Sequence, residues 1–245
     1  MYENDKNILI AVSYYQSRNQ EHLVRLLSNI DSYKRNTVVV VNSDEINGNE
    51  ALETEVSGWK MYIRKNTGMN IGAWNHAFQN HPDKDYYFFF QDECFIKKNG
   101  FIESCINKFQ ADPNLAMLGE SLNLKWNKSW LDLQQSPMNW VDSDHIIEGK
   151  PVPRVFYYQE TLKRLGISAG DSGLHLRSLC WAFKGSIRRK MNGFPEGTSK
   201  GECIAIEIGV SRKVAQLGYD FAQLENQPFN YIGHREWRAD GSSKI

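Results

Sequence analysis

Two neighbouring acidic residues, Asp92 and Glu93, follow a strongly apolar run at residues 86–90 and are preceded by Gln91. A short apolar run of this kind is typical of a strand that is buried on both faces, so the acidic side chains stand at its carboxyl end. Carboxylate oxygens bind hard divalent cations, whereas the carbonyl of a Gln side chain can only assist. The segment is therefore a candidate metal site.

Two further strand-like runs, residues 8–14 and 37–41, also end in polar residues. In open parallel sheets, ligands bind where the strands end at their carboxyl edge. A helix N-cap or a turn explains a single polar strand end equally well, but three such ends in one sheet favour a binding site. The residues concerned are Ser13, Tyr14, Tyr15 and Gln16 after the first run, and Asn42, Ser43, Asp44 and Glu45 after the second.

A segment rich in Gly and Asn separates an apolar run at residues 60–64 from a helical pattern at residues 71–79. Gly permits a tight turn and the close approach of a ligand, and Asn both donates and accepts hydrogen bonds, which suits a hydroxyl-rich ligand. A plain loop between a strand and a helix explains the same composition. The candidate binding residues here are Asn66, Gly68 and Asn75.

The elements that must position these residues alternate between strand-like and helical patterns. This alternation predicts an α/β fold with a mostly parallel central sheet flanked by helices, and we expect a single domain over residues 1–245. Gly218 is the expected left-handed cap of the last helix. The expected strands are residues 8–14, 37–41, 60–64, 86–90, 116–119, 179–183 and 219–224, and the expected helices are residues 19–30, 71–79, 101–109, 158–165, 186–191 and 203–217.

Residues 123–154 interrupt the alternation with three Trp residues, three Pro residues and little periodicity. A long irregular stretch inside a compact domain is usually a functional loop, and we expect it to fold as a lid over the bound substrates. The alternative is that any one of Trp126, Trp130 and Trp140 fills a core.

Composition and charge exclude several classes of protein. Of the 245 residues 41% are hydrophobic and 24% charged, which rules out a disordered chain, collagen and a coiled coil. The 29 basic residues balance 29 acidic ones, so we expect no nucleic-acid partner. The cysteines Cys94, Cys105, Cys180 and Cys203 lack zinc-site spacing, and four free thiols fit a reducing compartment. With neither a secretory signal nor a membrane-length apolar run, we expect a soluble, cytoplasmic protein without a transmembrane segment.

Three common motifs are absent from the sequence. It has no G-x-G-x-x-G after the first strand and no Walker A motif, which disfavours a dinucleotide-binding Rossmann enzyme and a P-loop ATPase. It also lacks the G-x-S-x-G elbow of one large class of Ser hydrolases.

The motifs that are present resemble, in their order, those of the GT-A glycosyltransferases, most closely the inverting family 2 type, over residues 7–224. In that family a first strand ends in a Pro-Thr-Tyr-Asn-like segment, which corresponds to residues 13–16. A second strand ends in Asp-Asp, where this chain has Asn42-Ser43 followed by Asp44. An N-x-G segment then opens an Asn-bearing helix, as Asn66 to Gly68 and Asn75 do here.

Three later motifs continue the resemblance. The D-x-D signature that ends the fourth strand reads Gln91-Asp92-Glu93 in this chain. A Gly-Gly-Phe-Asp-Glu-like turn corresponds to Asn-Gly-Phe-Pro-Glu at residues 192–196. The helix that follows opens with Glu-Asp in the family and ends in Gly-Tyr, which correspond to Ile206-Glu207 and Gly218-Tyr219.

The resemblance implies a nucleotide-sugar-dependent hexosyltransferase, of the kind used in polysaccharide biosynthesis. It would move a sugar from a UDP-, GDP- or dTDP-linked donor to a hydroxyl of a saccharide or lipid-linked acceptor, with inversion. A divalent cation, Mn²⁺ or Mg²⁺, would neutralise the diphosphate from Asp92, Glu93 and His234, although a surface His in a polar tail explains His234 as well. The phosphates would meet Arg235, Arg238 and Arg177, and the nucleotide would meet Ser13, Tyr14, Tyr15, Asn42, Asp44, Asn66, Gly68, Asn75 and Gln91.

A general base must take the proton from the attacking hydroxyl. By its position in the Glu-Asp motif, Glu207 is the first choice and Glu202 the second, and the alternative for both is a solvated helix charge. The apolar neighbours Ile206 and Ile208 favour an embedded Glu207, because a buried carboxylate is costly.

Two other functions stay open. The first is a catalytically inactive GT-A-like binding or assembly module, motivated by Gln91 and Asn42 at two positions where the family has Asp. The second is another nucleotide-using enzyme on a similar sheet, such as a nucleotidylyltransferase, which the lack of a Gly- and Arg-rich first loop disfavours. Peripheral membrane association and a homodimer also stay open.

Overall fold

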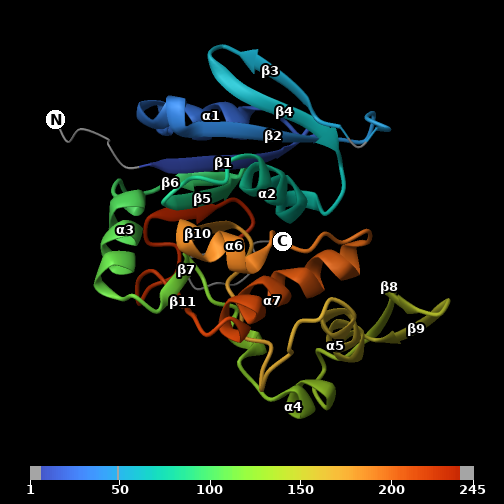
Figure 1. Ribbon diagram of the computed structural model, residues 1–245. Coiled ribbons are helices and arrows are strands. Elements are labelled where there is room, and N and C mark those ends of the chain that lie inside the picture. Colours follow the sequence, from blue (N-terminus) through green and yellow to red (C-terminus); the bar gives the residue numbers. More distant parts are fainter. Residues whose placement is uncertain (1–6, 49, 238–245) are drawn as a thin grey trace.

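An eight-stranded sheet forms the centre of the computed structural model, which describes residues 7–48 and 50–237. Its strands are β1 (Ile8–Tyr15), β2 (Thr37–Ser43), β3 (Leu52–Val56), β4 (Trp59–Lys65), β5 (Tyr86–Gln91), β7 (Leu115–Gly119), β10 (Cys180–Lys184) and β11 (Asp220–Gln223). They lie in the order β11-β7-β10-β5-β1-β2-β4-β3 (Figure 1). Only β3 and β10 pair antiparallel with their neighbours in this sheet. The expected fold class, a mostly parallel sheet flanked by helices, is confirmed.

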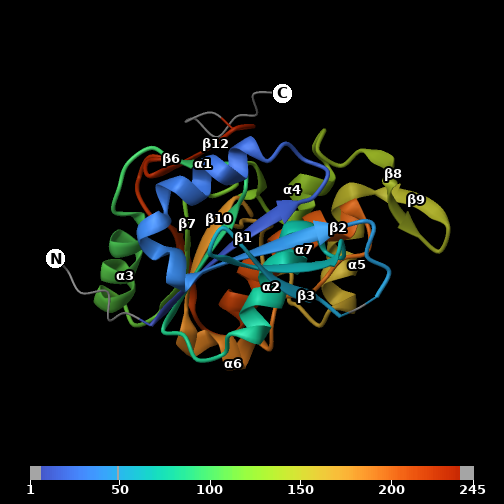
Figure 2. The ribbon, with the colours of Figure 1, turned by 90° about the horizontal axis from the view of Figure 1, so that it is seen from above.

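Helices cover both faces of the sheet. One face is covered by the helices α1 (Glu21–Asn29) and α3 (Phe101–Ala111). The other face is covered by α2 (Met69–Asn80), α6 (Arg188–Met191) and α7 (Lys200–Gln216) (Figure 2). Alternate side chains of β5 enter the two cores: Phe88 and Phe90 face α3, whereas Tyr87 and Phe89 face α2. Burial on both faces explains why this strand is apolar throughout.

Two short strands extend the frame around the end of β5. The strand β6 (Cys94–Ile96) pairs antiparallel with β12 (Ile232–His234), which sets His234 opposite Cys94. The 3₁₀ helix η1 (Asp31–Asn36) leads from α1 into β2. Neither β6 nor β12 was expected from the sequence, since strands of this length show no periodicity.

The segment 123–154 is structured, in contrast to the irregular lid expected from the sequence. It contains η2 (Leu124–Trp126), α4 (Trp130–Gln134) and a hairpin of β8 (Val141–Ile147) and β9 (Lys150–Pro153), and it leads into α5 (Arg154–Arg164). These elements lie beyond α7 on the side away from the sheet (Figure 1). Trp126 and Trp130 are only 3% and 7% exposed and share a third core with α5 and α7, whereas Trp140 is 47% exposed. The core alternative therefore holds for two of the three Trp residues.

The other expected elements are confirmed within a few residues. One difference is at residues 186–191, where η3 (Gly185–Ile187) precedes α6. Gly218 has a φ of +81°, the left-handed conformation expected of a helix cap. All four cysteines are free. Among the described helices none is both long and apolar enough to cross a membrane.

Candidate functional site

The carboxyl ends of β1, β2 and β4 meet at one edge, because these strands are parallel and adjacent. There the Tyr15 hydroxyl donates a hydrogen bond to the Asp44 carboxylate, which also accepts one at 3.0 Å from Nδ2 of Asn66. The bonds from Tyr15 and Asn66 hold the pKa of Asp44 below its usual range. Tyr15 and Asp44, predicted from two strand ends, and Asn66, predicted from the Gly- and Asn-rich loop, thus form one polar surface, which we call the Asp44 surface.

The predicted residue Asn42 has both polar atoms of its side chain engaged inside the protein. Its Nδ2 donates to the Met69 carbonyl at 2.8 Å, and its Oδ1 accepts from Arg64 Nη1 at 2.9 Å. These bonds fix the start of α2, where Gly68 adopts a φ of +73° that favours glycine. Asn42 therefore positions the Gly-rich loop.

Asn75 connects α2 to the turn at residues 192–196. Its Oδ1 accepts from the Phe194 N–H at 2.8 Å, and its Nδ2 donates to Glu196 at 2.8 Å. Beside this connection, a cavity of about 410 Å³ lies between the loop at Asn66 and Gly68 and the start of α7. Two segments that lie far apart in the sequence, residues 65–69 and residues 197–200 with Cys203, thus form the walls of this cavity.

The acidic pair at the end of β5 is buried: Asp92 is 2% and Glu93 8% exposed. Nη1 of Arg18, from the loop after β1, lies 2.6 Å from Oε2 of Glu93 and 3.4 Å from Oδ1 of Asp92. Burial raises the pKa of Asp92 to about 6, although the charge of Arg18 opposes this shift. Arg18 was not among the residues predicted for the site; its only signal in the sequence is that it is a basic residue in the loop that follows the first strand.

Ser13 and Tyr14, from the end of β1, are buried and turned inward. The Ser13 hydroxyl donates to the Phe90 carbonyl at 3.3 Å, which ties β1 to β5. The Tyr14 hydroxyl donates to the Arg18 carbonyl at 2.7 Å. Both hydroxyls therefore position the strand end and the loop that carries Arg18.

Gln91 lies between the acidic pair and the tail of the chain. Its Oε1 is 3.1 Å from Nε2 of His234, and its Nε2 donates to the Ser178 carbonyl at 2.6 Å. Nδ1 of His234 accepts from the Glu236 N–H at 3.2 Å. Both ring nitrogens are engaged, in the pattern of a neutral imidazole protonated on Nε2.

A divalent cation does not fit these residues as they are placed. Arg18 is bonded to both carboxylates, Asp92 and Glu93, and the ring nitrogens of His234 are hydrogen-bonded. Within the described ranges, no group of three or more His, Cys, Asp or Glu side chains is arranged to hold a metal ion. One oxygen, Oδ2 of Asp92, is buried without a hydrogen-bond partner. A single such oxygen falls well short of the oxygen ligands that Mg²⁺ and Mn²⁺ require.

The backbone of Ser178 links α7 to the end of β5. Its N–H donates to Oε1 of Glu207, and its carbonyl accepts from Nδ2 of Asn70 at 2.8 Å as well as from Gln91. Oε2 of Glu207 lies 4.0 Å from Nε2 of the buried His175. The Glu207 side chain is 20% exposed, so a predicted base reaches the carboxyl edge with some access to solvent.

Glu202, the second candidate base, belongs to the N-terminal cap of α7. Ser199 Oγ accepts from the Glu202 N–H at 3.2 Å, and the Glu202 carboxylate accepts from the Thr198 N–H at 2.7 Å and also from Arg164. Burial alone would raise the pKa of Glu202, but the bonds from Thr198 and Arg164 outweigh it and lower the pKa to about 2. This reciprocal arrangement is close to a capping box.

The predicted phosphate-binding arginines differ in their surroundings. The Arg177 guanidinium lies 4.0 Å from the centre of the Trp237 ring and donates to Asn123 at 3.2 Å. The Arg235 N–H donates to the Glu93 carbonyl at 3.3 Å, while Nη1 of its exposed side chain lies 3.0 Å from Nε2 of His22 on α1. Arg238 lies outside the described residues.

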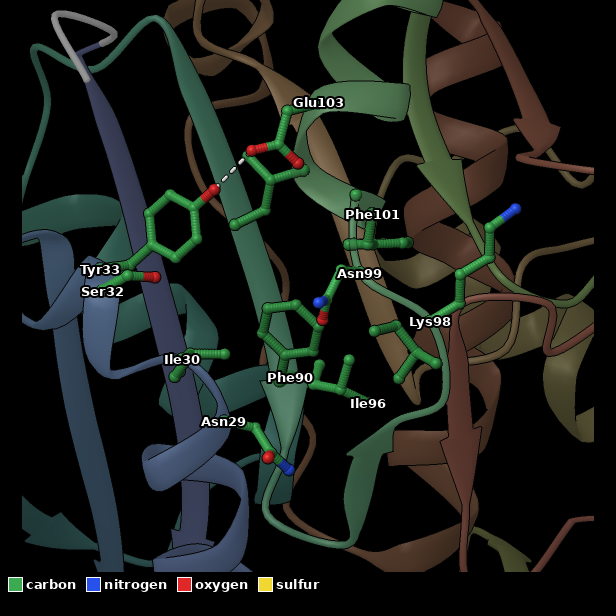
Figure 3. A pocket seen from close by; sticks show the side chains of 13 residues that line it. Asn29, Ile30, Ser32, Tyr33, Phe90, Ile96, Lys98, Asn99, Phe101 and Glu103 are labelled. Carbon is green, nitrogen blue, oxygen red and sulfur yellow. Dashed lines mark hydrogen bonds between the residues drawn. The ribbon is translucent and has the colours of Figure 1, made fainter. Parts of the chain in front are cut away.

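A separate pocket of about 260 Å³ lies between η1 and the start of α3 (Figure 3). Phe90, Ile96 and Phe101 form its apolar side, while Tyr33 donates a hydrogen bond to Glu103 at its rim. Its lining contains none of the residues predicted for the site.

Solved structures that are similar in fold include the mannosyltransferase PcManGT from Pyrobaculum calidifontis, determined with GDP-Man and Mn²⁺. It is 14% identical with a TM-score of 0.48, and the match covers 89% of this chain and 54% of that chain. A CMP:2-keto-3-deoxy-manno-octonic acid synthetase complexed with CTP is 9% identical, with a TM-score of 0.44 and 89% of each chain covered. The bifunctional glycosyltransferase WbbM, in its apo form, is 11% identical with a TM-score of 0.38, over 85% of this chain and 38% of that chain.

These similarities concern the fold alone. The chain spans about half the length of PcManGT. No protein-family model matches the chain, and no curated protein matches it in sequence.

Proposed function

We propose that the chain is a glycosyltransferase that moves a sugar from a nucleotide-diphosphate sugar to a hydroxyl of a saccharide or lipid-linked acceptor, with inversion. The observation that carries the proposal is the backbone of Ser178, whose N–H donates to Glu207 and whose carbonyl accepts from Gln91 and Asn70. A carboxylate from α7 and the end of β5 are thereby tied together. Sugar transfer needs such a pairing, because the base and the diphosphate must flank one sugar.

The Asp44 surface is the proposed site of the nucleoside. The half-buried Tyr15 ring offers a stacking face to a base, and such stacking tolerates different bases. The Asp44 carboxylate and the Asn66 amide lie together beside it and suit hydroxyls of the ribose. This arrangement supports a nucleoside ligand but not the identity of the base.

Glu207 is the proposed general base. In a single displacement the acceptor oxygen attacks the anomeric carbon, the bond from that carbon to the diphosphate oxygen breaks, and the hydroxyl proton passes to Glu207. Glu202 is a poor base by comparison, because its pKa is lowered to about 2 and its oxygens are occupied by the cap. The divalent cation implied by the family resemblance supplies no step here, since the residues as placed do not fit one.

The test is release of nucleoside diphosphate from a panel of UDP-, GDP- and dTDP-sugars, with and without simple saccharide acceptors. We expect one donor to be hydrolysed slowly and transferred faster. A complete lack of turnover, with retained nucleotide binding, would favour the inactive binding module. Release of pyrophosphate from a nucleoside triphosphate and a sugar 1-phosphate would instead identify a nucleotidylyltransferase.

A further inference from the structure

We infer that Arg18 is a built-in cation at the Asp92–Glu93 pair and that it binds the diphosphate of the donor in place of a divalent metal. This inference rests on the proposed function and adds a residue to it. Nη1 of Arg18 approaches both carboxylates, at 2.6 Å and 3.4 Å, and so stands where the resemblance puts the cation.

Burial makes a positive partner necessary at this place. Asp92 and Glu93 are adjacent acidic residues with side chains only 3% and 9% exposed. A buried charge without a partner is strongly unfavourable, and two neighbouring carboxylates also repel each other. Arg18 compensates for both effects from one position.

Arg18 keeps hydrogen-bonding capacity for a ligand. Its side chain is 43% exposed, and both of its ion pairs are made by Nη1. Within the described part of the chain, its Nε and Nη2 donate no hydrogen bond. A guanidinium presents its donors in a planar fork that matches the oxygens of a phosphate group, so a bidentate contact remains available.

The backbone holds Arg18 in place. Its carbonyl accepts from the Tyr14 hydroxyl at 2.7 Å, and its N–H donates to the Tyr15 carbonyl at 2.9 Å. The loop continues β1, which lies between β2 and β5 in the sheet. Arg18 therefore stands between the Asp44 surface, which follows β2, and the acidic pair, which follows β5. A diphosphate that joins a nucleoside at the Asp44 surface to a sugar near the acidic pair has to pass Arg18.

The experiment measures the affinity of UDP, GDP and dTDP by calorimetry, in EDTA and in Mn²⁺. We expect the best-bound nucleotide to bind the wild type equally well, within about twofold, in both conditions. Arg18→Gln should weaken this binding by roughly tenfold or more, the scale of a lost charge-assisted contact, while the affinity for the matching nucleoside changes little. Arg25→Gln, with the same change of charge on α1, where the Arg25 guanidinium lies over the Phe95 ring, is the control and should bind normally.

Arg18→Lys controls for a loss of folding, because it keeps the positive charge and removes only the planar arrangement of guanidinium donors. We expect it to melt near the wild type and to bind the diphosphate with intermediate affinity. Binding that requires Mn²⁺ in the wild type, or equal losses in Arg18→Gln and Arg25→Gln, would overturn the role of Arg18 and leave the proposed function standing. Absence of nucleotide binding in both conditions would contradict the proposed function and the inference together.

Discussion

Oε2 of Glu207 lies 4.0 Å from Nε2 of His175, a residue that is 1% exposed. Nδ1 of His175 is 2.6 Å from the Gly173 carbonyl, and the Asn123 amide lies 3.3 Å from Nε2. Burial lowers the pKa of His175, and the charge of Glu207 opposes this shift only in part. A neutral imidazole beside Glu207 leaves that carboxylate able to accept a proton, whereas an imidazolium would hold it in an ion pair.

The first prediction separates the two candidate bases. We expect Glu207→Gln to lower kcat by a factor on the order of 10² or more, because the acceptor hydroxyl loses its proton acceptor. Affinity for nucleoside diphosphate should be nearly unchanged. Steady-state kinetics and calorimetry on the same preparation measure both quantities.

Glu202→Gln is the matched control on the same helix. It should keep most of kcat and lower the melting temperature by a few degrees, because a weakened cap costs about 1 kcal/mol. A larger loss of kcat in Glu202→Gln than in Glu207→Gln would make Glu202 the base and refute the assignment.

The second prediction concerns the third core. Trp130 is buried, and its Nε1 donates to the Ala169 carbonyl at 3.1 Å. Trp130→Ala should therefore destabilise the protein by about 3–5 kcal/mol, as is typical of a lost buried aromatic side chain. Trp140→Ala, at an exposed position in the same segment, should change the melting temperature little. Equal melting temperatures for the two variants would show that Trp130 is not part of a core.

The third prediction is a dependence of stability on pH. Burial raises the pKa of Glu120 to about 7, well above the usual value for a glutamate, although the backbone N–H groups around it, including that of Tyr231, oppose the shift. The folded state then binds the proton more tightly than the unfolded state does. The contribution of Glu120 to the free energy of unfolding should thus be fully present below about pH 4.5, the pKa expected in the unfolded chain. It should be lost as the pH rises through 7, by an amount on the order of 3 kcal/mol.

Denaturant unfolding at a series of pH values measures this loss. Glu120→Gln removes the titrating group, so its unfolding free energy should fall less over the same pH interval. Parallel pH profiles for the wild type and the variant would mean that Glu120 does not titrate there.

The fourth prediction tests the Asp44 surface. Tyr15→Ala should weaken nucleoside diphosphate binding by about tenfold or more, since stacking of a base on an aromatic ring contributes about 1–3 kcal/mol. Tyr15→Phe keeps the ring and loses only the hydrogen bond to Asp44, so it should retain most of the affinity. If both variants bind as the wild type does, the nucleoside lies elsewhere.

Much of the fold could be predicted from the sequence, because β1, β2 and β5 are apolar throughout and strands of this kind are buried on both faces. The hairpin of β8 and β9 was missed, since β8 alternates polar residues with few apolar ones and β9 contains two prolines. Local pattern does not encode which distant segments these strands contact.

The candidate site was predictable only in part. Asp44, from a polar strand end, and Asn66, from the Gly- and Asn-rich loop, were both predicted for the site, and they lie side by side because parallel strands bring their carboxyl ends to one edge. The amide of Asn75 was expected to face a ligand and instead holds the turn at residues 192–196. A side-chain amide can bond a ligand or the protein itself, so the residue type alone could not show which of these Asn75 contacts. Arg18 was missed because its pairing with Glu93 spans loops that are far apart in the sequence.

Helix α7 is held from two sides, with Ile206 and Val210 in the core against the sheet and Ala205 and Ile208 in the core against α5. It cannot slide or rotate without disturbing both cores, since protein interiors are close-packed. Glu207 lies between these contacts and is preorganised by them. If Glu207 is the base of the proposed reaction, the reorganisation that a mobile base would need in every turnover is already completed when the chain folds, and adaptation to different acceptors would have to come from the loops around the site.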